Sequence, residues 1–481
     1  MFLGGDYEPS VRKLDLSCHF AGGKLGHKDS QRSHSEMPQL RDFRIARFPL
    51  SNVDFSIRPE TASAVTALRD CRHWSLWDDG DDMKLILFLG AGVSAPSGLP
   101  TATELMERIM RGTYHQEESH VYRAGPGTDP VLRAIDLTPR IRRLLKILTA
   151  HDIRDIKRGG YYPVRRGFRS SGAIYRGSST YEDVFFLCQQ ISLWNIGLSD
   201  NSLATPFMEC IERKARGWLS GRTIKARISD LATLGSQACD LIETVVADAL
   251  RQKYRAGFDL LLELATAPEI EQLNIVTLNH DTLTEQYLLA HGVDFVDGFG
   301  PADGDVRWSD DRLYDSAAAR VQLFKLHGSV DWYRFSGSAR TAMVPGGIAR
   351  TVNDGAGKRL NPLFRRPSFL SGVNKVTWYQ RGIYADIHFR FHQLLRGCGH
   401  IVMSGYGWGD MAINFQLDKW MDDCDRNRII LLHETPEKLV NRSMLLESAY
   451  DGWTRSGQLI CIRLWLSDTS LKELQPFLRS A

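Results

Sequence analysis

A turn rich in glycine and serine is the part of this sequence best suited to hold a phosphate group. Residues Gly90–Pro100 contain three glycines, two serines and two prolines in eleven positions. Glycine lets the backbone turn sharply, so bare N–H groups can approach a ligand. The preceding apolar run, Leu85–Leu89, has the length of a strand buried on both faces. The pattern after Pro100 becomes helical, so we expect the turn to present a phosphate to the start of a helix.

Polar side chains end two later apolar runs, 273–281 and 321–329. These side chains belong to Thr277, Asn279, Asp281, His327 and Ser329. Alternate residues of a strand share one side, so the three polar residues of the first run lie together. Ligands of open α/β sheets bind at the carboxyl ends of the strands. The sequence therefore predicts that an amide, a carboxylate and an imidazole meet beside the glycine turn.

The glycine turn matches neither of the two common nucleotide-binding fingerprints. Ala95 stands where the third glycine of G-x-G-x-x-G belongs, and no G-x-x-x-x-G-K-[ST] occurs in the chain. The segment resembles the sirtuin signature G-A-G-x-S-x-x-S-G-[ILV]-P. The matching residues are Gly90, Ala91, Gly92, Ser94, Ser97, Gly98, Leu99 and Pro100. The polar ends of the two later runs resemble the sirtuin motifs T-x-N-x-D and L-H-G-S, in the order of that family.

A fourth segment, Gly399–Phe415, resembles the G-Y-S-F-x-D-x-x-I-N pattern of sirtuin-like proteins from bacterial antiphage systems. The matching residues are Gly405, Tyr406, Asp410, Ile413 and Asn414. Gly407 replaces the usual serine, so a hydroxyl that could contact a ribose or phosphate is missing. Glu434 follows the next apolar run, and two interpretations stay open. It either binds ribose hydroxyls or caps a helix that starts near Pro436.

The resemblance implies that NAD binds at these strand ends as a substrate. The implied NAD-binding residues are Gly90, Ala91, Gly92, Ser94, Ser97, Pro100, Thr277, Ser329, Gly405, Tyr406 and Glu434. We expect the backbone N–H groups of Gly90–Ser94 to bind the pyrophosphate. Catalysis would fall to three residues. Asn279 would hold a water, His327 would take a proton, and Asp281 would orient Asn279 or the ribose, or stabilise positive charge.

Two departures from the deacylase sirtuins favour hydrolysis of NAD over deacylation of proteins. The eight cysteines form no C-x-x-C pair, so the chain cannot build the zinc module with that spacing, and no metal is expected. The family's arginine soon after Pro100 is also missing, since Thr101, Ala102 and Thr103 stand there. With water as the acceptor, the products are nicotinamide and ADP-ribose. The resemblance further implies an antiphage effector that depletes NAD in abortive infection.

Composition and charge are those of an ordinary globular protein. The chain has 481 residues, is 43% hydrophobic and 24% charged, and carries a net charge of +3. The motifs span most of the chain, so we expect one α/β domain with a Rossmann-like parallel sheet and helices on both faces. Its predicted bounds are 81–470, after a partly flexible extension, 1–80. Cysteine usage and the absence of a long apolar run or a signal peptide predict a cytoplasmic protein without membrane contact.

The long stretch 111–272 is predicted to be a helical insertion within this domain. Tyr181–Trp194 has apolar residues at helical spacing, and Ala238–Ala265 is expected to form one long helix. Acidic residues in the first turn of the former are explained by the helix dipole. The segment 140–169 is strongly basic, which allows nucleic-acid contact or a solvated face. From the resemblance we expect a homo-oligomer and a regulatory partner such as a HerA-type ATPase or a short Argonaute.

Three other functions remain open. The chain could be an NAD-dependent protein deacylase or ADP-ribosyltransferase, which would need an acceptor other than water. It could be a non-catalytic subunit that binds NAD or ADP-ribose. It could also act on DNA through the basic segment, in which case its affinity would fall steeply with salt.

Overall fold

The computed structural model of the chain describes residues 83–111, 114–116, 122–124, 135–136, 138–158, 180–194, 204–315, 320–345, 351–363, 366–372 and 375–478. The chain divides into two units, and all of these residues belong to the second, Cys71–Ala481. The predicted extension, 1–80, lies outside the described residues. So does the part of the basic segment from 159 to 169.

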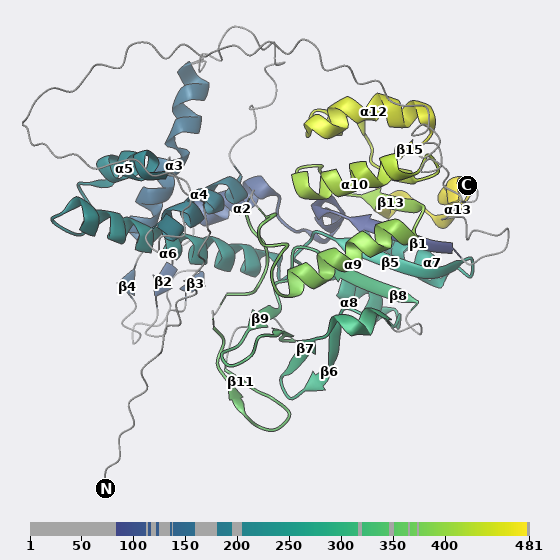
Figure 1. Ribbon diagram of the computed structural model, residues 1–481, viewed down its shortest axis with the longest axis horizontal. Coiled ribbons are helices and arrows are strands. Elements are labelled where there is room, and N and C mark those ends of the chain that lie inside the picture. The colour runs from purple at the N-terminus through teal and green to yellow at the C-terminus, as the bar shows by residue number, and fades with distance from the viewer. Residues whose placement is uncertain are drawn as a thin grey trace, which may run out of the picture. The chain divides into compact units, whose positions relative to one another are not determined.

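A six-stranded parallel sheet carries the ends of the predicted motif strands (Figure 1). Its order is β15-β14-β13-β1-β5-β8. The strands are β1 (Met83–Leu89), β5 (Ile270–Thr277), β8 (Val321–Lys325), β13 (His400–Ser404), β14 (Arg428–Leu432) and β15 (Leu459–Ile462). The chain builds outward from β1 through β5 and β8, then returns to the other side of β1 with β13. The strand order therefore reverses between β1 and β13, which is where open sheets bind ligands.

Helices cover both faces of this sheet, as predicted. Alternate residues of β1 supply the two cores: Leu85 and Leu87 face one side, Ile86 and Phe88 the other. One face packs against α7 (Asp259–Thr266), α8 (Leu283–Ala290) and α13 (Leu471–Leu478). The opposite face packs against α9 (Ile383–Gly397), α10 (Met411–Asp423) and α12 (Met444–Ser456). The short element α11 (Glu437–Val440) lies between β14 and α12, and η5 (Leu466–Asp468) lies between β15 and α13.

The turn after β1 differs from the prediction. A 3₁₀ helix, η3 (Ala91–Ser97), begins directly after Gly90 and ends at Gly98, which has a φ of +80°. The predicted helix after Pro100 is confirmed as α2 (Ala102–Arg111), but η3 stands between it and β1. The first helical N–H groups after the strand thus belong to a short, tight helix rather than to α2.

The predicted insertion contains helices with a core of their own. They are α3 (Thr138–Arg158), α4 (Tyr181–Trp194), α5 (Ala204–Ala215) and α6 (Ile224–Leu250), and α2 packs with them. Strands β2 (Tyr114–Gln116), β3 (Tyr122–Ala124) and β4 (Ile135–Asp136) form a small sheet there. The helix predicted for Tyr181–Trp194 is confirmed. The prediction of a single long helix over Ala238–Ala265 is wrong, because residues 251–258 are not helical and separate α6 from α7. Within this stretch Gly257 has a φ of +108°.

A second small sheet, absent from the sequence prediction, follows α8. Its order is β6-β7-β10-β9, with antiparallel pairing. The strands are β6 (Phe299–Asp303), β7 (Val306–Ser309), β9 (Trp332–Arg334) and β10 (Thr341–Met343). Nearby lie η4 (Asp311–Asp315), β11 (Val352–Asn353) and β12 (Arg359–Leu360). Strands this short carry too little alternation to be recognised from the sequence.

Throughout the described ranges, no helix is both long and apolar enough to cross a membrane.

Candidate functional site

Two backbone turns touch at the switch point between β1 and β13. The N–H of Gly90 donates to the carbonyl of Ser404 over 2.9 Å, and that of Gly92 donates to the carbonyl of Gly405 over 3.0 Å. A Cβ on Gly90 would lie 2.5 Å from the Gly405 oxygen. Glycine is needed here because backbone meets backbone. The N–H of Val93 donates to the Gly90 carbonyl. The expectation that the turn's N–H groups face a phosphate is therefore wrong for Gly90, Gly92 and Val93, because all three already bond to backbone carbonyls.

A chain of hydrogen bonds joins this turn to the end of β5. The Asn279 amide nitrogen donates to the Gly90 carbonyl and to Ser94 Oγ, each over 3.1 Å. Ser94 Oγ donates in turn to Asp281 Oδ2 over 2.9 Å, while Asp281 Oδ1 accepts the Leu283 N–H over 3.0 Å. Both N–H bonds of the Asn279 amide are used, so its oxygen is the atom left to accept a hydrogen bond.

Three further predicted hydroxyls fasten loops to one another. Thr277 Oγ1 donates to the last carbonyl of β1 over 3.2 Å, and Ser97 Oγ donates to the Ala256 carbonyl over 3.1 Å. Ser329 Oγ donates to the His280 carbonyl over 3.3 Å, which joins the ends of β8 and β5. All three side chains are buried. Thr277 and Ser329 thus link neighbouring strand ends, and Ser97 links η3 to the loop before α7.

His327, which follows β8, is held by two residues from distant loops. Its Nε2 lies 2.9 Å from the Tyr379 hydroxyl and 3.2 Å from Asp410 Oδ2. The Tyr379 hydroxyl also donates to Asp410 Oδ2 over 2.9 Å. The other oxygen of Asp410 caps α10 by accepting the N–H groups of Ala412 and Ile413. One carboxylate therefore starts a helix and fixes an imidazole.

Two hydrogen-bonded groups of three side chains at the strand ends form what we call the strand-tip cluster. Its members are Ser94, Asn279, Asp281, His327, Tyr379 and Asp410. One group holds Asn279 and Asp281 with Ser94. The other holds His327 with Tyr379 and Asp410, which the sequence did not single out as site residues. Asp410 had a visible signal, since an aspartate just before a helix is a typical N-cap. Tyr379 had none.

Charge and burial set the protonation of this cluster. Burial lowers the pKa of His327, and the positive charge of Lys375 lowers it further, although Asp410 acts in the opposite direction. Burial alone would raise the pKa of Asp410, but its hydrogen bond to His327 and the positive charge of Lys375 hold it below the usual range. At neutral pH the imidazole is therefore neutral, as a general base must be, and the carboxylate is charged.

One segment covers His327; we call residues 366–372 and 375–382 the cover segment. The Leu370 N–H donates to the His327 carbonyl over 2.8 Å. The ring of Tyr379 stacks on His388 of α9, with 3.6 Å between ring centroids. His327 exposes only 3% of its surface. In this structure the imidazole is thus closed off by the protein itself.

The acidic first turn of α4 has two separate uses. The Thr180 N–H donates to Asp183 over 2.8 Å, and Thr180 Oγ1 accepts the Asp183 N–H, which is a capping box. Glu182 instead pairs with Lys375 of the cover segment over 3.0 Å. The helical insertion therefore holds the segment that closes over His327.

A buried ion pair supports the loop that carries Asp281. Lys325, the last residue of β8, lies 2.7 Å from Glu285 and also donates to the Asp281 backbone carbonyl. Burial would lower the pKa of Lys325, but the carboxylates of Glu285, Asp331 and Asp281 raise it, so the amine stays charged. The sequence signal for this pair is a lysine at the end of an apolar strand, and no role was predicted for that lysine.

The turn after β13 is braced by Asn414. Tyr406 donates from its hydroxyl to Asn414 Oδ1 over 2.7 Å, and the Asn414 amide donates to the Trp408 carbonyl over 2.9 Å. Trp408 has a φ of +55° and is fully buried. A large residue in this conformation is strained and needs such support. Tyr406 therefore acts on the shape of the turn rather than standing free.

The remaining predicted NAD-binding residues lie at the surface. Ala91 and Glu434 are exposed, and Pro100 is partly exposed. The capping interpretation of Glu434 is wrong, because Pro436 occupies the N-cap of α11 and no side chain caps it. The ribose interpretation stays a prediction.

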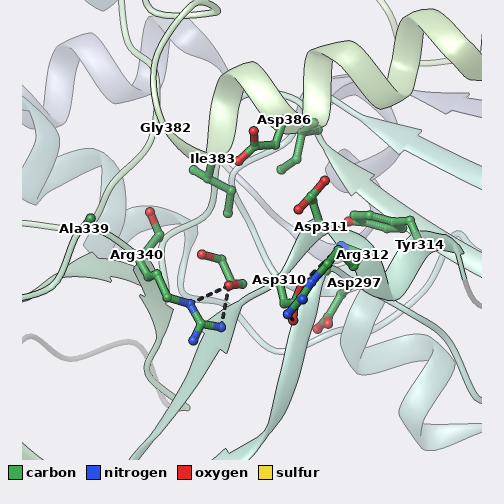
Figure 2. Close-up of a pocket in the computed structure, with 14 residues that line it drawn as sticks. Asp297, Asp310, Asp311, Arg312, Tyr314, Ala339, Arg340, Gly382, Ile383 and Asp386 are labelled. Atoms are coloured by element: carbon green, nitrogen blue, oxygen red, sulfur yellow. Dashed lines mark hydrogen bonds and ion pairs between the residues drawn. The ribbon is translucent and has the colours of Figure 1, made fainter.

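A cavity of about 370 Å³ lies away from these residues, between the small sheet, η4 and the start of α9 (Figure 2). We call it the acidic cavity. Its charged lining residues are Asp297, Asp310, Asp311, Arg312, Arg340 and Asp386. Arg312 pairs with Asp310, and Arg340 donates to the Ser309 carbonyl. None of the predicted site residues lines it.

Among the described residues, no group of three or more His, Cys, Asp or Glu side chains could hold a metal ion.

Comparisons with known proteins give only distant structural neighbours. No protein-family model matches the sequence, and no curated protein matches it. Among solved structures, a mutant Sir2 homologue in complex with ADP-ribose matches at 13% identity, with a TM-score of 0.29, over 78% of this chain and 92% of the other. A Sir2 homologue in complex with NAD matches at 14% identity, with a TM-score of 0.24, over 78% and 90%. Similarity this low does not assign the chain to that family.

Proposed function

We propose that this chain hydrolyses NAD. Water replaces nicotinamide at C1′ of the ribose, so a C–O bond forms, the C–N bond breaks, and nicotinamide, ADP-ribose and a proton leave. The observation that supports this most is the position of the strand-tip cluster. The Asn279 amide and the Asp281 carboxylate bond to the glycine turn at the point where the strand order reverses, and the His327 imidazole pairs with Asp410, which follows β13.

The contacts suggest a role for each catalytic residue. The amide nitrogen of Asn279 donates both of its N–H bonds to protein groups. The amide oxygen of Asn279 is therefore the atom that accepts a hydrogen bond from the attacking water. His327, neutral at pH 7, takes the proton from that water or from a ribose hydroxyl. Asp281 acts through Ser94 to orient Asn279, since both of its oxygens are bonded within the protein. This favours one of the three roles predicted for Asp281.

The dinucleotide would lie across the ends of β1 and β13. Ala91 and Pro100 offer exposed surface beside the first turn, and the exposed Glu434 after β14 would take ribose hydroxyls. The buried hydroxyls of Ser97, Thr277 and Ser329 would shape this site from below. Gly405 and Tyr406 would do the same through the turn that they form.

The resemblance to antiphage proteins extends the proposal to the cell. NAD loss during infection would stop the host before phage is released, and a partner such as a HerA-type ATPase or a short Argonaute would control it. The closed cluster supports the idea that the resting enzyme needs activation. Co-expression with the neighbouring gene, with NAD measured during infection, tests this part.

A second candidate is a subunit that binds NAD or ADP-ribose without cleaving it. One observation favours it: Asn279, Asp281 and His327 are each bonded to protein groups and expose 9% or less of their surface. A binding module needs no group poised for attack.

Incubation of the purified chain with NAD alone separates these functions. We expect nicotinamide and ADP-ribose in equal amounts, and at least 100-fold less with Asn279→Ala. Release only after an acylated peptide or protein acceptor is added would instead indicate a deacylase or a transferase. Binding of NAD without release, unchanged when the partner is present, would favour the binding module.

A further inference from the structure

We propose that Asp410 is a positioning residue that keeps the proton of His327 on Nε2, so that Nδ1 is the nitrogen free to take a proton. This inference rests on the proposed function for its catalytic meaning, but the position of the proton can be measured without any reaction.

The proton positions follow from counting donors and acceptors around Nε2. The Tyr379 hydroxyl has one proton and lies 2.9 Å from both Asp410 Oδ2 and His327 Nε2. The ionised Asp410 carboxylate has none to give. If Tyr379 donates to Asp410, its oxygen can accept, and both neighbours of Nε2 are acceptors.

The opposite arrangement is unfavourable. An unprotonated Nε2 could accept from Tyr379, but its lone pair would then also lie 3.2 Å from the Asp410 carboxylate with no proton between them. Burial makes such a contact costly, since His327 and Asp410 expose 3% and 11% of their side chains. A neutral imidazole with a proton on Nε2 satisfies all three groups.

Within the described part of the chain, the other charged and titratable groups around His327 have partners of their own or lie too far from Nε2 to bond it. Lys375 and Glu182 pair with each other over 3.0 Å. The ring of His280 lies 6.1 Å from that of His327, and His388 directs its Nε2 to the Leu326 carbonyl over 3.2 Å. Asp410 and Tyr379 are thus the groups that decide the tautomer.

Asp410 is suited to a conservative test because its two oxygens have separate partners. In Asp410→Asn the amide oxygen can keep the cap of α10, while the amide NH₂ replaces Oδ2. That NH₂ donates to Nε2, so the proton of His327 should move to Nδ1. Tyr379→Phe removes a hydroxyl but leaves the carboxylate, so the proton should stay on Nε2.

The experiment is nuclear magnetic resonance of the full chain labelled with ¹⁵N and ¹³C in histidine, with the His327 signals assigned by their loss in His327→Gln. We expect the Nε2–H form in the wild type and in Tyr379→Phe, and the Nδ1–H form in Asp410→Asn. The proposal is overturned if the wild type carries the proton on Nδ1, or if Asp410→Asn leaves it on Nε2.

Turnover of NAD then tests the catalytic meaning. We expect Asp410→Asn to lower kcat by about 100-fold or more with KM little changed, and Tyr379→Phe to lower it by less than about 10-fold. Ser443→Ala, which removes the N-cap of α12, is the control for a lost cap and should lower the melting temperature without lowering kcat. An unchanged kcat in Asp410→Asn, with active wild type, contradicts the positioning role.

Two results separate the proposals. If the wild type does not hydrolyse NAD but shows the expected tautomers, the proposed function fails and the positioning role stands. If Asp410→Asn does not fold, Asp410→Ser keeps an N-cap but has no group that reaches His327, and should give a mixture of tautomers. A pure Nε2–H form in that variant would overturn the role of Asp410.

Discussion

The strand-tip cluster and the acidic cavity are both rich in polar groups, but they use them differently. The cluster is closed, and its side chains form two hydrogen-bonded groups that draw on five separate segments of the chain. The cavity has room, about 370 Å³, and in its lining Arg312 pairs with Asp310 while Arg340 donates to the Ser309 carbonyl. Open volume therefore marks where a molecule could fit, whereas the convergence of an amide, a carboxylate and an imidazole marks where chemistry could occur.

The largest expected effect compares a variant of the strand-tip cluster with a variant of the acidic cavity. His327→Ala should lower NAD hydrolysis by about 100-fold to 10,000-fold, because it removes the proposed general base. Asp386→Asn, in the acidic cavity, should leave the rate within about twofold of the wild type. Nicotinamide release measures both. Equal losses in the two variants, or a larger loss in Asp386→Asn, would reverse the comparison.

The contact between the two glycine turns predicts a large effect on stability. In Gly90→Ala the new Cβ would lie 2.5 Å from the Gly405 oxygen, so the turns must separate. We expect a loss of about 1–3 kcal/mol or more in the free energy of unfolding. Gly407→Ala is the matched control, since nothing lies within 4 Å of its added Cβ. Denaturant unfolding of both variants measures the difference, and equal stabilities would show that the turns do not need this contact.

His388, whose ring stacks on Tyr379, should make the stability of the folded protein sensitive to acid. Burial and the charge of His327 lower the pKa of His388 to about 3, so the folded protein resists protonating a group that the unfolded chain protonates near pH 6.5. Its contribution to stability is complete above pH 6.5 and is lost as the pH falls from 6.5 toward 3. Between pH 6.5 and 5 we expect a loss of roughly 1.5 kcal/mol from this group.

His388→Gln should flatten the fall of unfolding free energy over this range. The exposed His392 lies on the same helix, so His392→Gln serves as the control and should leave the slope unchanged. A slope that is the same in all three proteins would show that His388 is not the group that titrates.

The smallest expected effect concerns Lys375 in the cover segment. Its positive charge lowers the pKa of His327, so Lys375→Gln should raise that pKa and move the acidic limit of activity to higher pH. The loss of its pair with Glu182 should cost no more than about 1 kcal/mol of stability, because Glu182 is partly exposed. A pH profile of turnover measures the shift. Movement to lower pH would contradict the assigned sign.

Much of the sheet and part of the candidate site could be predicted from local sequence. The apolar runs before Gly90 and Thr277 are long enough to be recognised as buried strands, and polar residues mark where they end. The N-cap role of Asp410 is equally local. By contrast, β6, β7, β9 and β10 are too short to show a period, and the apolar pattern does not reveal the eight residues, 251–258, that separate α6 from α7.

The amino-acid sequence by itself determined which chemical groups stand at the strand ends, because a strand and the turn after it are specified by neighbouring residues. Only the tertiary structure decided which of these groups meet. Tyr379 reaches His327 across 52 residues and Asp410 across 31, and Gly90 touches Gly405 because β13 lies beside β1. Such pairs depend on the order of strands in the sheet, and no local pattern of residues carries that information.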